Sequence, residues 1–220
     1  MLSKKALLAM LTGICQLCVS SYAFAQKAEK APVVISKTNT AIYNYDARVS
    51  DMDLTNFYDL DKKVKDDFYQ TITSSLKTVN GLTIKPMNFL AGKINYDHDG
   101  YPASRGKKAV ATNSADNYIN ISVSIEGAGM KAPANEKNPD DCFLTQKVAV
   151  KISITVYDKA GEQIFDESTS AKSKDKIDFH YSIISIGNLK SKKIQPADTK
   201  ILYDLLKEAT DEMTGTKFPK

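Results

Sequence analysis

Oxygen-donor side chains alternate over residues 95–100, the spacing with which a loop can hold a calcium ion. Asn95, Asp97 and Asp99 stand at every second position, and a glycine follows where such a loop bends sharply. A calcium loop also needs a bidentate acid at its twelfth position, which here is Gly106. The interpretation we favour is a turn in which an aspartate side chain caps the backbone, so no metal or other cofactor is expected. A calcium-dependent adhesion or binding protein stays open as one alternative.

A second set of residues has the types needed for nucleophilic catalysis. Cys142 is followed along the chain by Asp178 and His180. An imidazole can take the proton of a thiol, and an acid can orient the ring, which is the order found in cysteine peptidases that cut cell-wall peptides. Those enzymes begin a helix after the cysteine, whereas residues 143–145 lead into a strand. We therefore expect a structural thiol and no catalysis, and keep a cysteine-dependent cell-wall hydrolase as the other alternative.

Two long polar stretches, residues 91–115 and 127–141, are candidates for recognition. Loops of this length in a compact domain tend to be functional or mobile. The first stretch contains Tyr96, Tyr101 and Arg105, and tyrosine and arginine are residue types that often anchor interfaces. We expect these three side chains to carry binding, with loops that are simply mobile as the alternative.

Two alternating segments predict the sheet that positions these loops. In residues 148–156 and again in residues 119–125, apolar side chains occupy every second position. A period of two places them on one face of a strand, so the two segments are expected to be antiparallel neighbours with one covered face and one polar face. Residues 158–161, Asp-Lys-Ala-Gly, predict a turn, after which residues 162–165 return as a hairpin partner.

Two amphipathic segments predict helices. Apolar residues recur every three or four positions over residues 60–79 and again over residues 201–213. Asn-Gly at 80–81 predicts a left-handed stop to the first helix. Short strands are expected at residues 82–84 and 177–183. This order predicts an α+β domain, a mainly antiparallel sheet with the early and the C-terminal helix packed on one face.

Three further segments have weaker patterns. Residues 33–45 are compatible with one or two early strands, although their alternation slips. Residues 46–59 mix acidic and apolar side chains and are interpreted as a loop. The basic cluster at residues 190–193 is likewise interpreted as a solvated loop.

The first 25 residues have the pattern of an export signal. Lys4 and Lys5 precede an apolar run over residues 6–19, and Ala-Phe-Ala at 23–25 suits a signal peptidase. The run is interrupted by polar residues and is shorter than the roughly 20 apolar residues that span a bilayer. We predict cleavage after position 25 and no transmembrane segment in the mature protein.

Composition limits the partners that the exported chain can have. The 220 residues include 30 basic and 26 acidic residues, and the signal removes two lysines, so the nearly balanced remainder predicts no nucleic-acid partner. Cys15 and Cys18 also leave with the signal, so Cys142 has no partner for an intramolecular disulfide. We predict a flexible leader at 26–32 and a single domain at 33–220.

Three predicted elements together resemble the small α/β modules of Gram-negative envelope proteins. They are the helix at residues 60–79, the strand at 118–123 and the hairpin at 148–165. Examples are the amino-terminal domain of TolB, the curli-secretion lipoprotein and the outer-membrane activators of penicillin-binding proteins. The signal is likewise similar in style to those of Gram-negative bacteria. This resemblance implies a periplasmic or secreted accessory protein, non-catalytic, that works by docking an envelope protein.

Overall fold

The computed structural model describes residues 35, 39–51, 57–60, 62–127, 142–186, 189–196 and 199–219. The chain divides into two compact units, Met1–Val33 and Val34–Lys220, and every described residue belongs to the second. The predicted signal peptide and leader therefore lie outside the described residues. Among the helices that are described, none is long and apolar enough to cross a bilayer.

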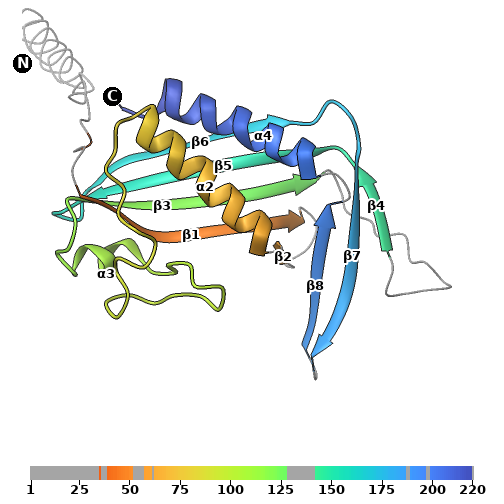
Figure 1. Ribbon diagram of the computed structural model, residues 1–220, viewed down its shortest axis with the longest axis horizontal. Helices are drawn as coiled ribbons and strands as arrows, with labels where there is room; N and C mark the ends of the chain where they lie inside the picture. The colour runs from red at the N-terminus through yellow and green to blue at the C-terminus, as the bar shows by residue number, and fades with distance from the viewer. Residues whose placement is uncertain are drawn as a thin grey trace, which may run out of the picture. The chain divides into compact units, whose positions relative to one another are not determined.

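The strands described form one eight-stranded sheet in the order β4-β7-β8-β2-β1-β3-β5-β6 (Figure 1). They are β1 (Thr40–Asp51), β2 (Phe57–Leu60), β3 (Asn117–Gly127), β4 (Cys142–Gln146), β5 (Val148–Asp158), β6 (Gln163–Lys172), β7 (Ile177–Ile186) and β8 (Leu189–Pro196). Neighbours are antiparallel except for the pairs β1–β3 and β2–β8, which are parallel. The prediction of a mainly antiparallel sheet is confirmed.

Two long helices lie side by side across one face of this sheet (Figure 1). Helix α2 (Lys62–Thr78) contacts β1, and helix α4 (Thr199–Glu212) contacts β5 and β6. A π-helical turn, η1 (Met213–Lys217), continues α4. The prediction that the early and the C-terminal helix pack on one face of the sheet is confirmed. The predicted α+β fold class is therefore also confirmed.

The core follows from the alternation in β3 and β5. Ile121 pairs with Ile154 and Val123 with Ile152, and all four side chains are fully buried beneath the helices. The helices bury their own apolar stripes against them: Val64, Phe68, Ile72 and Leu76 from α2, and Leu202, Leu205, Leu206 and Ala209 from α4. Each fully buried aliphatic or aromatic side chain contributes about 1.5–3 kcal/mol relative to an exposed one, so this layer is the main source of stability.

The predicted hairpin after β5 is present. The Asp158 carboxylate accepts hydrogen bonds from the backbone N–H groups of Ala160 and Glu162, at 2.8 and 2.9 Å. Gly161 has a φ of 86°, a conformation that glycine adopts without strain. The chain then returns as β6, with Val156 opposite Phe165.

The first strand is longer than the sequence predicted, and its slip in alternation has a structural cause. β1 runs to Asp51, and β2 follows at Phe57–Leu60, so residues 46–59 are not one loop. The register of β1 against β3 shifts between Ile42 and Asn44. Such a bulge adds one residue to a strand and reverses the parity of everything after it.

Two short segments also differ from expectation. Residues 190–193 lie in strand β8, not in a solvated loop, because β8 pairs with β7 on one side and β2 on the other. Residues 82–84 do not form a separate strand. Their backbone pairs with the sheet only through the bridge between Thr40 and Ile84.

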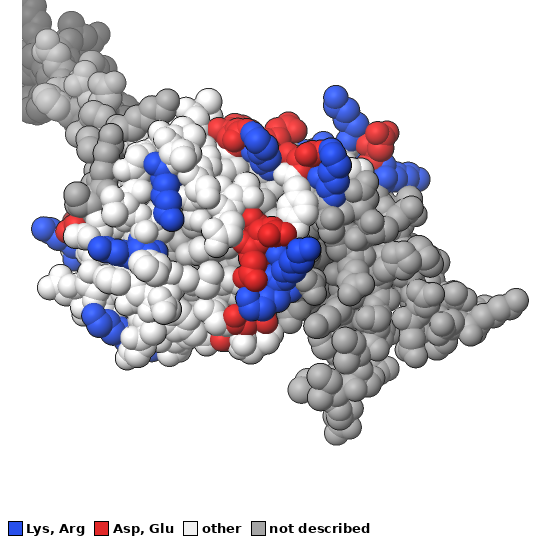
Figure 2. All heavy atoms as spheres, viewed as in Figure 1, with Lys and Arg blue, Asp and Glu red and all other residues white. Residues whose placement is uncertain are grey.

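Charges on the helix-covered face are mixed in sign. Figure 2 shows basic and acidic side chains interleaved there, without a large area of one sign. Three ion pairs join residues one helical turn apart. They are Lys62 with Asp66 at 2.9 Å, Lys200 with Asp204 at 2.7 Å, and Lys207 with Asp211 at 2.5 Å. This pattern is typical of a solvated helix surface.

Candidate functional site

Residues 85–116, which we call the cap, close the open edge of β1. β1 pairs with β2 only at Arg48–Ser50, which leaves backbone groups of its first half to be satisfied elsewhere. Lys85 N donates to Thr40 O at 2.9 Å, and Tyr45 N donates to Pro102 O at 2.9 Å. The cap is therefore fixed to the sheet by main-chain hydrogen bonds at both its beginning and its middle.

The cap also covers one end of the sheet face opposite α2 and α4. Tyr118 and Tyr157 belong to the parity that faces away from the long helices, and they pack against buried side chains of the cap. This second, smaller core consists of Ala41, Tyr43, Leu90, Ile94, Ala109, Ala115 and Tyr118, with Phe89, Tyr96, Val110 and Tyr157 packed around it. The face predicted to be simply polar is thus apolar where the cap lies.

The end of the cap is held by one buried hydroxyl. The Tyr118 hydroxyl accepts hydrogen bonds from the backbone N–H groups of Ser114 and Ala115, at 2.8 and 3.0 Å. Within the cap, the short helix α3 (Gly106–Val110) lies against the Tyr157 ring. A Cβ atom on Gly106 would be 2.6 Å from Cε2 of that ring, so the close approach requires glycine.

This approach explains why the twelfth position of the calcium-loop pattern is a glycine and not an acid. The other members of the pattern are engaged within the chain. The Asp97 carboxylate accepts from the backbone N–H groups of Asp99 and Tyr101, at 3.0 and 2.8 Å, as predicted for a capped turn. Asn95 Oδ1 accepts from Lys108 Nζ at 3.1 Å. No group of three or more metal-ligating His, Cys, Asp or Glu residues occurs in the part of the chain that is described.

Asp99 forms an ion pair with a lysine that the sequence did not single out. Its carboxylate lies 2.6 Å from the Lys65 ammonium on α2, and the two side chains are 18% and 6% exposed. Burial alone would raise the pKa of Asp99, but the hydrogen bond and charge of Lys65 lower it. The acid of the candidate calcium loop therefore fastens the cap to α2.

Tyr101 lies in the core. Its ring is 1% exposed and contacts the rings of Tyr45 and Tyr69, with centroids 4.9 and 6.4 Å away. Its hydroxyl donates to the Asp66 carboxylate on α2. Burial, followed by this carboxylate, raises the pKa of Tyr101. The expectation that Tyr101 anchors an interface is corrected: its side chain supports the cap from beneath.

Tyr96 and Arg105 have different surroundings. Tyr96 is partly buried, and its hydroxyl donates to Met87 O at 3.1 Å, while burial raises its pKa. Arg105 is exposed and precedes α3 in extended conformation. No described hydrogen bond or ion pair engages its guanidinium group. Of the three predicted binding residues, these two remain at the surface of the cap.

Arg105 lines a hollow between the cap and β1. The hollow has a volume of about 480 Å³ and is lined by Asn44, Asn95, Ala103, Ser104, Arg105 and Lys108. Asn44 is fixed by its own hydrogen bond, which Nδ2 donates to Asn120 Oδ1 on β3 at 2.8 Å. The lining therefore combines two cations with amides and a hydroxyl, a composition suited to binding and orienting a polar ligand.

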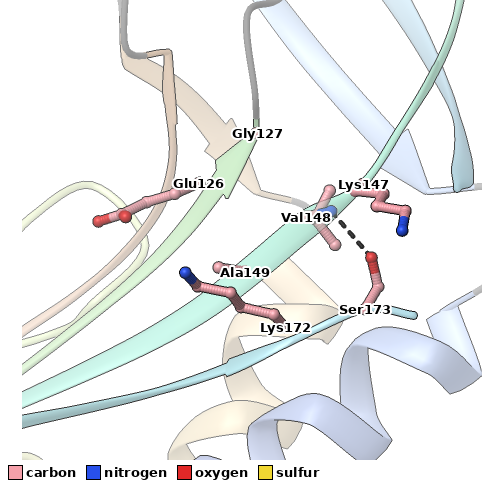
Figure 3. A pocket seen from close by; sticks show the side chains of 7 residues that line it. All are labelled: Glu126, Gly127, Lys147, Val148, Ala149, Lys172 and Ser173. Carbon is pink, nitrogen blue, oxygen red and sulfur yellow. Dashed lines mark hydrogen bonds between the residues drawn. The ribbon is translucent and has the colours of Figure 1, made fainter. Parts of the chain in front are cut away.

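A second, smaller hollow of about 250 Å³ lies at the last residues of β3 and β6 and the first residues of β5 (Figure 3). Ser173 Oγ accepts a hydrogen bond from Val148 N at 2.9 Å beside it. Glu126, Lys147 and Lys172 line it, and Figure 3 shows Lys147 extending away from the other two. It borders Gly127, the first residue of the second predicted recognition loop at 127–141, and the rest of that loop lies outside the described residues. With charges of both signs, this hollow indicates no ligand class.

The residues of the hydrolase alternative lie on neighbouring strands. The register of β4 and β7 places Cys142 opposite Tyr181 and Phe143 opposite His180, so Cys142 and His180 are one position out of register. Asp178 pairs with Thr145. Residues 143–145, expected only to lead into a strand, form part of the separate strand β4. The side chains of Cys142, Asp178 and His180 lie outside what the structure describes.

Sequence reasoning missed the residues that hold the cap, namely Lys65, Asp66 and Tyr118. Lys65 and Asp66 are polar positions of a helix for which the sequence analysis used only the apolar period, and Tyr118 lies in a strand at a position of polar parity. The one available signal was Tyr118 itself, a large aromatic residue among asparagine and serine on the same face.

Comparison with known proteins gives no family. No protein-family model and no curated protein matches the sequence. Among solved structures, a hypothetical protein of Chlamydia trachomatis matches with a TM-score of 0.35 and 14% identity, over 82% of this chain and 97% of that one. A candidate neuraminyllactose-binding hemagglutinin homologue of Helicobacter pylori matches with a TM-score of 0.38 and 4% identity, over 84% and 87%. A lipoprotein of Neisseria meningitidis matches with a TM-score of 0.30 and 11% identity, over 61% and 81%. At these scores the likeness carries no conclusion about function.

Proposed function

We propose that this chain is an exported envelope protein, non-catalytic, that binds another protein through the surface of its cap. The observation that carries the proposal is the cap itself. It is anchored to the sheet edge, to α2 and to Tyr118, yet it presents Arg105 outward beside a polar hollow. A rigid scaffold that holds polar loop residues at a surface is a common basis of recognition.

The rest of the described surface offers less for a specific partner. Charged side chains on α2 and α4 form three ion pairs within their own helix, Lys62 with Asp66, Lys200 with Asp204, and Lys207 with Asp211. Among the residues whose side chains are described, Val79 is the large apolar residue that is exposed, at 47%, and a single such residue does not make a docking patch. These features favour the cap over the helix-covered face.

The envelope location rests on residues 1–25, which have the charge and apolar pattern of an export signal. Cleavage would leave the leader at 26–32 and the domain at 33–220. The single cysteine that remains is consistent with a domain that depends on its core and not on disulfides for stability.

Substitutions on the cap test this function. We expect Arg105→Gln and Tyr96→Ala each to reduce recovery of a crosslinked envelope partner from intact cells. Lys107→Gln is the matched control, because Lys107 is an exposed cation two residues from Arg105 that does not line the hollow. Circular dichroism and melting temperature should show that Arg105→Gln remains folded. If the partner's yield is unchanged in both cap variants, the proposed function is wrong.

A further inference from the structure

The hollow beside Arg105 carries positive charge that the chain does not neutralise. Arg105 and Lys108 line it, and no Asp or Glu does. Lys108 Nζ donates to Asn95 Oδ1, an uncharged acceptor, so this contact orients the ammonium group without cancelling its charge.

The acids that lie near the hollow in the sequence are committed to other groups. Asp46 lies 3.1 Å from Arg48, and Asp99 lies 2.6 Å from Lys65. Asp97 caps the backbone of its own turn. Lys65 on α2, and not a basic residue at 105–108, is the cation that pairs with Asp99.

A buried polar atom also lacks a partner here. Ser104 lines the hollow, and its Oγ is buried without a hydrogen-bond partner in the described part of the chain. A buried hydroxyl left unsatisfied costs about 1–3 kcal/mol, so a water molecule or ligand group that reached Ser104 Oγ would be stabilised there. Arg105 and Lys108 supply the exposed donors of the same lining.

We infer that this hollow is a carboxylate-binding site, filled by an acidic side chain of the partner protein. Guanidinium and carboxylate groups match in shape and form paired hydrogen bonds, and a neighbouring ammonium and hydroxyl add further donors. The volume of about 480 Å³ is enough for a Glu or Asp side chain with its flanking backbone. The assignment of this carboxylate to a partner protein rests on the proposed function. The affinity of the hollow for an anion does not depend on that function.

The site can be tested on the isolated protein with defined probes. We would titrate the ¹⁵N-labelled domain with a blocked Glu-Glu peptide, with its Gln-Gln counterpart and with inorganic phosphate, and follow the backbone amides. We expect saturable shifts centred on residues 103–108 with the Glu-Glu peptide alone. In Arg105→Gln the dissociation constant should rise about ten-fold, as for the loss of one charged hydrogen bond. Lys107→Gln should bind like the wild type.

Several results would overturn this assignment. They are the absence of saturable shifts, shifts that are equal for the Gln-Gln peptide, or an Arg105→Gln variant that binds as tightly as the wild type. Saturation by phosphate at lower concentration than by the Glu-Glu peptide would show a phosphate site instead.

The two proposals can fail separately. If the peptide binds at residues 103–108 but cap substitutions leave partner capture unchanged, the carboxylate site stands and the proposed function falls. If partner capture depends on Tyr96 and Arg105 while the peptide does not bind, the function stands and the carboxylate site falls.

Discussion

The Tyr101 hydroxyl donates a hydrogen bond to the Asp66 carboxylate, joining the cap to helix α2 across 35 residues of sequence. Beside it, Lys65 on α2 pairs with Asp99 of the cap. Consecutive residues of one helix thus hold two positions of the cap. Together with the main-chain hydrogen bonds to β1 and the Tyr118 hydroxyl, these two links hold a segment without a long helix or strand on the sheet.

Removing the hydroxyl of Tyr101 should measure the first link. We expect Tyr101→Phe to lower the free energy of unfolding by about 1–2 kcal/mol, because a partly buried hydrogen bond to a charged acceptor is lost while the ring stays in place. Urea unfolding with an unchanged m-value would measure it. Tyr157→Phe is the control, since that hydroxyl makes only a long, exposed contact at 3.5 Å. Equal stability of the Tyr101 variant and the wild type would show that the link contributes nothing.

The carboxylates of Asp66 and Asp99 should make the free energy of unfolding decrease at acidic pH. The Tyr101 hydrogen bond and Lys62 lower the pKa of Asp66 against the opposing effect of burial, and Lys65 lowers that of Asp99. A carboxyl with a lowered folded pKa binds fewer protons when folded, so its stabilisation is present above the unfolded pKa of about 3.9 and is lost as pH falls through the folded value.

The test of this pH dependence is a series of urea titrations below pH 5. Tyr101→Phe should flatten the decline, because it removes the largest cause of the Asp66 shift. Tyr96→Phe should not, since the Tyr96 hydroxyl donates to a carbonyl and not to a carboxylate. A decline of the same slope in Tyr101→Phe and the wild type would contradict this assignment.

The ion pair of Lys65 and Asp99 should respond unequally to loss of either partner. Asp99→Asn removes the carboxylate charge beside the Lys65 ammonium, which is 6% exposed. We expect this change to lower the free energy of unfolding by about 2–4 kcal/mol. Lys65→Met should cost less, because Asp99 is 18% exposed and therefore remains closer to water than the Lys65 ammonium does. Thermal unfolding of both single variants checks the order, and the reverse order would refute it.

Local patterns were sufficient to predict the elements in which apolar residues recur at a regular spacing. The alternation of β5, the turn at Asp158 and the three-to-four residue spacing of α2 and α4 each report a face that is buried on one side. The same signal predicted that β3 and β5 are neighbours, because both present one apolar parity.

Elements that depend on distant partners could not be predicted in this way. β8 has no alternation, since Lys190, Lys192 and Lys193 interrupt it, and it becomes a strand through pairing with β7 and β2. The bulge in β1 reverses its parity, so the sequence indicated an early strand only as far as residue 45 and not its continuation to Asp51.

The candidate site was predicted only in part for the same reason. Its sequence marked Tyr96, Tyr101 and Arg105 as binding residues but gave no sign of which would be buried. Tyr101 is buried because α2 supplies Asp66 and β1 supplies Tyr45 at that point, and both lie far away in the sequence.

The most direct test of the proposed function is site-specific photocrosslinking in intact cells. A photoreactive residue would replace Lys107 on the cap, which leaves Arg105 in place, and in separate variants Ser170 on β6 and Glu208 on α4, all exposed positions. We expect a discrete adduct with an envelope protein from position 107, and none from positions 170 and 208. Discrete adducts from position 170 or 208, with none from position 107, would contradict a binding surface on the cap.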